Sequence, residues 1–153
     1  MGVLVVIGVT GSGKTKLGLA LAERLGCEFR DADDLHLPAN ILKMQAGTPL
    51  TDADRAPWLT RVAAWIAEHT EGTGGVIACS ALRRRYRDVL RGESDRVTFI
   101  AIETARPLLA ERMRVRSGHF MPATLLDSQL ATWERPDPDE RVIFVSGEQT
   151  VAQ

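Results

Sequence analysis

The chain has 153 residues, of which 44% are hydrophobic, so it is long enough for one well-packed domain and too short for two ordinary ones. Its formal net charge of −1 at pH 7 argues against a general nucleic-acid binder or a membrane-surface protein. No apolar stretch approaches the roughly 20 residues of a membrane span, and no basic region precedes the first apolar run, so we expect a cytoplasmic protein without a membrane partner.

The expected secondary structure alternates between strands and helices along the chain. Short β-rich runs lie at 3–8, 27–31, 75–79, 97–102 and 141–145. Segments with helical periodicity lie at 14–25, 39–46, 52–70, 83–91, 105–117 and 122–134. The first, third and fourth strands are continuously apolar, which is typical of strands buried on both faces. The sequence therefore predicts an α/β fold with a parallel sheet.

The first expected strand leads into a glycine-rich loop that fits the pattern G-x-x-x-x-G-K-[S/T]. The loop consists of Gly8, Val9, Thr10, Gly11, Ser12, Gly13, Lys14 and Thr15. Between a strand and a helix, such a loop turns its backbone N–H groups inward around phosphates, Lys14 can reach the outer phosphates, and the Thr15 hydroxyl can hold Mg²⁺. We interpret it as a nucleoside triphosphate site. An ordinary glycine turn is the alternative, which the flanking strand and helix disfavour.

Acidic residues follow the second expected strand, at the edge where open parallel sheets bind ligands. If the strand continues, Asp31 and Asp33 point the same way, because side chains alternate with period two. Asp31 could then serve the Mg²⁺ hydration shell, while Asp33 accepts a proton from an attacking hydroxyl. The alternative is that both residues only form a turn or cap a helix. His36 is close enough to be a substrate contact.

The connection between the second and third strands is far longer than a simple crossover needs, so we expect an inserted helical subdomain there. Thr51 and Asp54 have the spacing of a capping box at the start of one of its helices. Trp58, Val62 and Trp65 fall on one face of that helix, which indicates core packing.

Arginines gather on two expected helices. Arg83 and Arg87 share one face of the helix after the third strand and offer a fork for a carboxylate or a phosphate, with a solvated charged face as the alternative. Arg112 and Arg116 have the same spacing and precede the irregular segment 117–122, a candidate lid. Lid cations would stabilise charge on a phosphoryl group in transfer, whereas surface ion pairs are the alternative.

These segments together resemble the bacterial-type gluconokinases of the P-loop kinase group. Besides the glycine-rich loop, the resemblance rests on Asp31-Ala-Asp-Asp-Leu-His36, Pro38-Ala-Asn-Ile-Leu-Lys-Met44, Gly47-Thr-Pro-Leu-Thr-Asp-Ala-Asp-Arg55, Pro57-Trp-Leu59, Cys79-Ser-Ala-Leu-Arg-Arg-Arg-Tyr-Arg-Asp88, Gly118-His-Phe-Met-Pro122 and Leu126-Asp-Ser-Gln-Leu130. The segments occur in order over residues 2 to about 145. The glycine-rich loop would fit many kinases, whereas the second and third segments are more specific.

The resemblance implies ATP-dependent phosphorylation of D-gluconate at its terminal hydroxyl, giving 6-phospho-D-gluconate and ADP with Mg²⁺. It also implies a three-layer fold like that of nucleoside monophosphate and shikimate kinases, with a five-stranded parallel sheet flanked by helices. The chain would form a single P-loop kinase domain, in which 36–70 is the substrate-binding insert and 114–124 is the lid. A homodimer is the family's common assembly.

By similarity, Asp33 matches the catalytic base, Asp31 the residue nearer the metal, and Arg116 a lid cation. We expect in-line transfer in which Lys14, Mg²⁺ on Thr15 and Arg116 neutralise the developing charge. We assign Arg112 to the nucleotide. The substrate contacts are drawn from Asp33, His36, Arg55, Arg83, Arg87 and His119.

Other functions stay open on the sequence. One is a kinase for another small anion, such as shikimate or a nucleoside monophosphate. Another is a nucleotide-binding module with weak activity, although the chain has neither an N-K-x-D run nor an Asp-x-x-Gly after the third strand. Zinc and redox functions lack support, because Cys27 and Cys79 form neither a C-x-x-C pair nor a Cys/His cluster.

Overall fold

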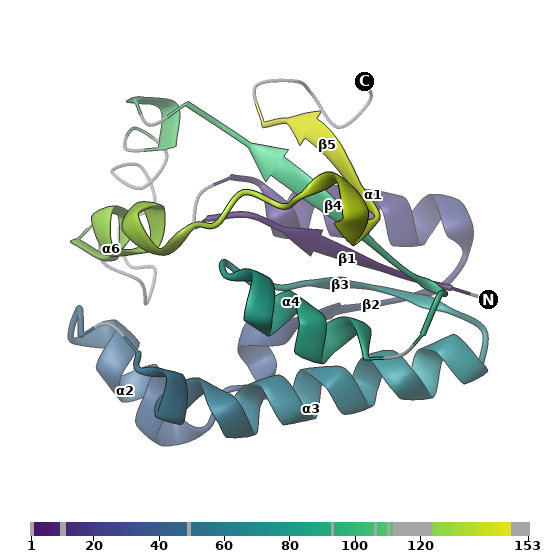
Figure 1. The fold of residues 1–153 in the computed structure, drawn as a ribbon, viewed down its shortest axis with the longest axis horizontal. Helices are drawn as coiled ribbons and strands as arrows, with labels where there is room; N and C mark the ends of the chain where they lie inside the picture. The colour runs from purple at the N-terminus through teal and green to yellow at the C-terminus, as the bar shows by residue number, and fades with distance from the viewer. Residues whose placement is uncertain are drawn as a thin grey trace.

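The fold is built around one parallel sheet. The structure, a computed structural model, describes residues 2–9, 12–48, 50–92, 94–105, 107–109, 111 and 124–147. The five strands are β1 (Val3–Ile7), β2 (Glu28–Asp31), β3 (Gly75–Ala78), β4 (Val97–Glu103) and β5 (Val142–Ser146). They pair in parallel in the order β2-β3-β1-β4-β5 (Figure 1). The predicted parallel sheet is confirmed, and each strand agrees with its predicted range to within one residue at either end.

Helices fill most of the connections between the strands. The α-helices are α1 (Lys14–Leu25), α2 (Pro38–Gln45), α3 (Asp52–Glu71), α4 (Arg84–Arg91) and α6 (Thr124–Thr132), and short 3₁₀ helices are η1 (Ala32–Leu35) and η2 (Pro138–Glu140). Each of these α-helices was predicted from the sequence, and for α6 the predicted bounds are two residues wider at each end. Neither of these 3₁₀ helices was predicted. None of the described helices combines the length and the apolar character of a membrane span.

The central strand β1 is covered by helices on both of its faces. On one face, Val3, Val5 and Ile7 pack with side chains from α3 and α4. On the other face, Leu4 and Val6 pack with side chains from α1. Because side chains alternate along a strand, one apolar run can contribute side chains to the core on both faces of the sheet. The result is the three-layer arrangement of Figure 1, with α1 on the far side of the sheet from α3 and α4.

Helix α3 connects the region of the predicted insert to the core of the sheet. At its first turn, the carboxylate of Asp54 accepts a hydrogen bond from Lys43 of α2 at 2.9 Å. Further along the same helix, Trp58, Val62 and Trp65 are buried in the main core, as predicted. One continuous helix therefore holds α2 in a fixed relation to the sheet.

The start of α3 is fixed by the predicted capping box. The Thr51 hydroxyl accepts from the Asp54 amide at 3.1 Å, and the Asp54 carboxylate accepts from the Thr51 amide at 2.9 Å. Both bonds satisfy backbone donors that a helix end otherwise leaves unpaired.

Replacing Thr51 by alanine should lower the free energy of unfolding by about 1 kcal/mol, because the Asp54 amide loses its acceptor. Urea denaturation followed by circular dichroism measures the change. Thr60→Ala is the matched control, since Thr60 is exposed in the middle of the same helix and its hydroxyl bonds only to the Ala56 carbonyl. Equal losses in the two variants would contradict a special role for the cap.

Candidate active site

The candidate site lies at the carboxyl edge of the sheet. In Figure 1 the strands run from the N-terminal side of the molecule towards the side occupied by α2 and α6. The strand order places β1 beside β3, and the connection after β1 leads to β2 on one side while the connection after β3 leads to β4 on the other. Such a switch point opens a crevice at the carboxyl ends of the strands, where ligands bind in open α/β sheets.

The glycine-rich loop after β1 has the steric features of a phosphate cradle. A Cβ added at Gly8 would lie 2.8 Å from the Ser12 Oγ, so no side chain fits there. Gly13 has φ 96°, a left-handed conformation that favours glycine, and it caps the N-terminus of α1. The N-terminus of a helix carries a partial positive charge, which attracts anions. Thr10 and Gly11 lie outside the described residues.

Two side chains of the cradle are held by one backbone carbonyl. The Ser12 hydroxyl donates to the Val9 carbonyl at 2.7 Å, and the Lys14 ammonium donates to the same oxygen at 3.0 Å. Ser12 is buried, so the first bond is shielded from water. The position of Val9 therefore sets the position of the lysine.

Thr15 and Asp31 form an oxygen-rich pair beside the cradle. The Thr15 hydroxyl donates to the Asp31 Oδ2 at 3.1 Å, which links the first turn of α1 to the end of β2. Hydroxyl and carboxylate oxygens are the ligands that Mg²⁺ takes in proteins. In the part of the chain that the structure describes, no three His, Cys, Asp or Glu side chains gather as a metal cluster. A phosphate-bound Mg²⁺ fits such a site, since it needs only one or two protein ligands.

The prediction that Asp31 and Asp33 point the same way along one strand is wrong. Strand β2 ends at Asp31, and Asp33 lies in the 3₁₀ helix η1. The Asp31 Oδ1 accepts from the Asp33 amide at 3.0 Å and so caps this turn. The capping alternative is thus correct for one oxygen of Asp31, while its other oxygen contacts Thr15. The turn still brings the two carboxylates together.

The carboxyl group of Asp33 has unusual proton affinity. Its pKa is raised to about 6, first because burial disfavours the charged form and then because Asp31 is negative, while Lys14 opposes the shift. The side chain nevertheless keeps 29% of its exposure, so a ligand can reach it. A carboxylate with a pKa near neutrality, close enough to Lys14 of the cradle for that charge to lower its pKa, can act as a general base.

His36 is a neutral, oriented donor beside Asp33. Asn40 donates through Nδ2 to the Asp54 carbonyl at 2.8 Å, which fixes its amide, and the same nitrogen lies 3.4 Å from the His36 Nδ1. Since an amide nitrogen only donates, Nδ1 is the acceptor and Nε2 carries the hydrogen. This Nε2 lies 4.0 Å from an Asp33 oxygen.

The charge state of His36 follows from its surroundings. The ring stacks on Trp58 with centroids 4.3 Å apart. Burial, then the positive charge of Arg55, lowers the pKa of His36 to about 4, so the imidazole is uncharged at pH 7. Trp58 also donates to the Ala32 carbonyl at 2.7 Å, so α3 supports the turn that carries Asp33.

Arg55 belongs to a polar cluster that sequence reasoning missed. Its guanidinium donates to the Tyr86 hydroxyl at 3.0 Å, and the guanidinium groups of Arg55 and Arg85 lie 5.3 and 5.4 Å from the Tyr86 ring centroid. The Tyr86 hydroxyl in turn donates to Asp52. That hydrogen bond, with the charges of Arg85 and Arg83, holds the pKa of Asp52 below its usual value. The one sequence signal for this cluster was Tyr86, which stands between arginines in the run 83–87.

Arg83 lies at the N-cap of α4, next to this cluster. Its side chain is 34% exposed, and its Nη1 lies 3.6 Å from the Glu134 carboxylate. Arg83 and Arg55 are thus cations around the pair formed by Tyr86 and Asp52.

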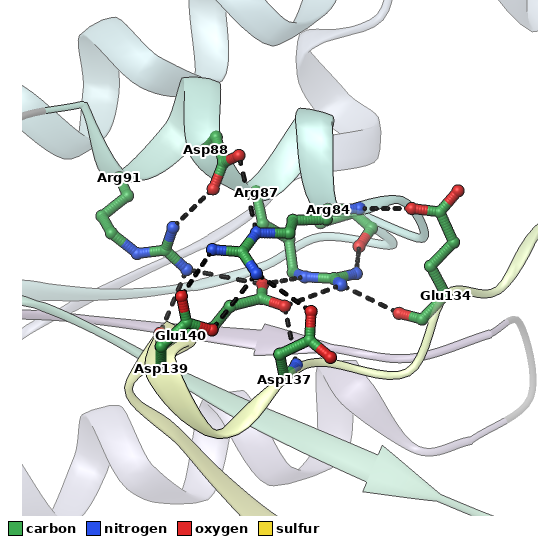
Figure 2. A network of polar contacts seen from close by, with 9 residues as sticks. Arg84, Arg87, Asp88, Arg91, Glu134, Asp137, Asp139 and Glu140 are labelled. Carbon is green, nitrogen blue, oxygen red and sulfur yellow. Dashed lines mark hydrogen bonds and ion pairs between the residues drawn. The ribbon is translucent and has the colours of Figure 1, made fainter.

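Arg87, predicted to bind a substrate, is instead fully buried. Its side chain and that of Glu140 are both 0% exposed. Its Nε donates to the Glu140 Oε1 at 2.7 Å, and its Nη1 and Nη2 donate to the carbonyls of Ala81 and Glu134 at 3.0 and 2.8 Å (Figure 2). Every guanidinium nitrogen is engaged inside the protein, so the prediction of a substrate contact is wrong. Helical spacing predicts that Arg87 and Arg83 share a helix face. It does not indicate that the segment around Glu140 covers Arg87.

Several predicted site residues lie outside the described residues. These are Arg112, Arg116 and His119, together with the predicted lid 114–124 except for Thr124, where α6 begins.

Comparison with known proteins identifies the group to which this site belongs. The model of the family described as "Shikimate kinase" matches residues 10–135. A gluconokinase from Gluconobacter oxydans (strain 621H) is 54% identical over 147 residues, which span 95% of this chain and 83% of that protein. A thermosensitive gluconokinase from Escherichia coli (strain K12) is 44% identical over 140 residues, or 91% of this chain and 75% of that protein.

A solved structure agrees with these sequence matches. The crystal structure of a gluconokinase from Sinorhizobium meliloti 1021 superposes with a TM-score of 0.88 at 45% identity, covering 99% of this chain and 85% of the other. The chain therefore belongs to the shikimate kinase family of P-loop kinases and, within it, to the gluconokinases.

Proposed function

We propose that this protein transfers the γ-phosphoryl group of ATP to the terminal hydroxyl of D-gluconate, giving 6-phospho-D-gluconate and ADP. The observation that carries the proposal is the juxtaposition of a phosphate cradle with an accessible carboxylate whose pKa is about 6. Membership of the gluconokinases supports the choice of acceptor.

In the proposed reaction, Asp33 orients the acceptor hydroxyl and takes its proton. The hydroxyl oxygen forms a bond to the γ-phosphorus as the bond from that phosphorus to the β,γ-bridging oxygen breaks, in line. Lys14 and the N-terminus of α1 offset charge on the phosphates. Arg116 would add a second cation from the lid, and Arg112 would contact the nucleotide.

Thr15 and Asp31 are the residues that we propose for Mg²⁺. Their oxygen atoms already lie within hydrogen-bond distance of each other beside the cradle, at 3.1 Å. When bound, Mg²⁺ supplies positive charge that offsets the charge of the phosphate oxygens.

Arg55 and Arg83 are the residues that we propose for the sugar-acid carboxylate. An anionic acceptor needs a fixed cation to orient it, and guanidinium groups match the two oxygens of a carboxylate. Tyr86 supports Arg55 through both its hydroxyl and its ring. His36 would donate from Nε2 to a substrate hydroxyl, and His119 remains a predicted contact. A homodimer and a cytoplasmic location also remain predictions.

ADP release in a coupled assay tests the acceptor. With ATP and Mg²⁺, we expect rapid turnover on gluconate, and only background release with shikimate, a nucleoside monophosphate or no acceptor. Turnover on shikimate without turnover on gluconate would overturn the proposed function.

Asp33→Asn should lower kcat by at least about 10²-fold, because the amide cannot take the proton of the hydroxyl. ATP binding, measured by calorimetry, should change little. The exposed neighbour Asp34 provides the control, and Asp34→Asn should retain activity within a few-fold. Near-normal turnover in the Asp33 variant would remove this residue from the base role.

The pKa of Asp33 also predicts a pH profile. Because only the ionised carboxylate accepts a proton, kcat/KM for gluconate should fall about tenfold per pH unit below about pH 6. Initial rates between pH 4.5 and 8 at low gluconate measure the profile. A plateau that extends unchanged to about pH 4.5 would contradict the raised pKa.

A further inference from the structure

The pair formed by Arg87 and Glu140 lies inside the protein and away from solvent, yet it is attached to two segments that reach the candidate site. Arg87 comes from α4, and Glu140 comes from η2, before β5. Figure 2 shows the guanidinium between these two elements, with Arg84 and Arg91 binding the same acidic segment on either side. A buried ion pair is weak evidence for a stabilising role, since replacing both partners by neutral residues is often neutral for stability.

The first attached segment is the loop after β3. Arg87 donates to the Ala81 carbonyl at 3.0 Å. Ala81 is buried and has φ 38°, a left-handed conformation that a non-glycine residue adopts at a cost of roughly 1 kcal/mol or more. The surroundings must hold such a residue in place. The buried arginine is a donor that does so.

The second attached segment is the chain that follows α6. Arg87 donates to the Glu134 carbonyl at 2.8 Å, and the Glu134 amide donates to the Leu82 carbonyl at 2.7 Å. The Glu134 carboxylate also accepts from the Arg84 amide at 3.0 Å. The loop after β3 and the segment after α6 are therefore joined directly and through the guanidinium of Arg87.

The loop after β3 also contacts the residue that precedes the phosphate cradle's lysine and serine, Val9. Leu82 packs in a small buried cluster with Val9 and Leu109, and Leu130 of α6 packs against the cluster. Val9 is the residue whose carbonyl holds both Ser12 and Lys14. A shift of the loop after β3 would therefore move Val9, whose backbone carbonyl supports the lysine.

We propose that Arg87, neutralised by Glu140, is a positioning residue that sets the geometry of the transfer site without touching either substrate. It holds the loop that carries Arg83, it anchors the segment that follows α6, and through Leu82 and Val9 it supports Lys14. The inference about gluconate turnover rests on the proposed function, whereas the inference about nucleotide affinity does not.

The double variant Arg87→Met/Glu140→Gln separates positioning from stability. It leaves no buried charge and keeps an acceptor for the Asp137 amide, which bonds to Glu140 at 2.8 Å. The carbonyls of Ala81 and Glu134 lose their donors. Compared with Arg87→Met alone, which leaves Glu140 buried without its closest partner, the double variant should recover much of the thermal stability. Its kcat/KM for gluconate should still be reduced about tenfold, and its Kd for a fluorescent ATP analogue should be raised several-fold.

Two further variants complete the test. Arg87→Lys keeps the ion pair, and hence the fold, but cannot serve both carbonyls, so it should also weaken binding of the analogue several-fold. Arg84→Gln removes only exposed ion pairs of the same helix, and its kcat/KM and analogue affinity should stay within twofold of the unmodified protein.

Wild-type kcat/KM and analogue affinity in a stable double variant, or in Arg87→Lys, would overturn the proposal. An equal loss in Arg84→Gln would also overturn it. If the unmodified chain fails on gluconate, the affinity measurements still decide the positioning role.

Discussion

The burial of β1 on both faces is the constraint on which the other features depend. Its side chains pack alternately on α1 and on α3 with α4, so the strand cannot slide or tilt without disturbing both layers. The chain leaves this fixed strand directly into the phosphate cradle. Backbone N–H groups can bind phosphates with good geometry only if the strand before them and the helix after them do not move. The core thus supplies the rigidity that the site needs.

The carboxylate of Asp33 shows how the site departs from what folding alone would favour. Its pKa is raised to about 6, so between its ordinary pKa and this value the folded protein binds more protons than the unfolded chain. Above about pH 6 the folded state holds a desolvated negative charge, and the group therefore contributes less stability at neutral pH than at pH 4 to 5. A buried base is retained at a cost in stability where its proton affinity is useful.

The fold and the glycine-rich loop of the site were predictable because they depend on local sequence patterns. Strand periodicity, the spacing of the glycines and the capping box of Thr51 each act within a few residues, and a residue type at a fixed spacing specifies them. Arg87 could not be understood in this way. Its environment is created by Glu140, more than fifty residues later, and no periodicity connects the two. Asp33 is an intermediate case, since its proximity to Asp31 was predicted but the turn that produces it was only the alternative to a strand.

Trp58 links helix α3 to both the turn that carries Asp33 and the His36 ring. The indole donates to the Ala32 carbonyl at the start of η1, and His36 stacks on its ring. The helix, the turn with Asp33 and the imidazole are thus tied as one body. Because α3 is also packed in the main core, this body is fixed relative to the sheet, so the distance between the candidate base and the cradle is set before an acceptor enters. Alignment of the reaction then depends on how the acceptor is oriented between the base and the cradle, because neither of them needs to move.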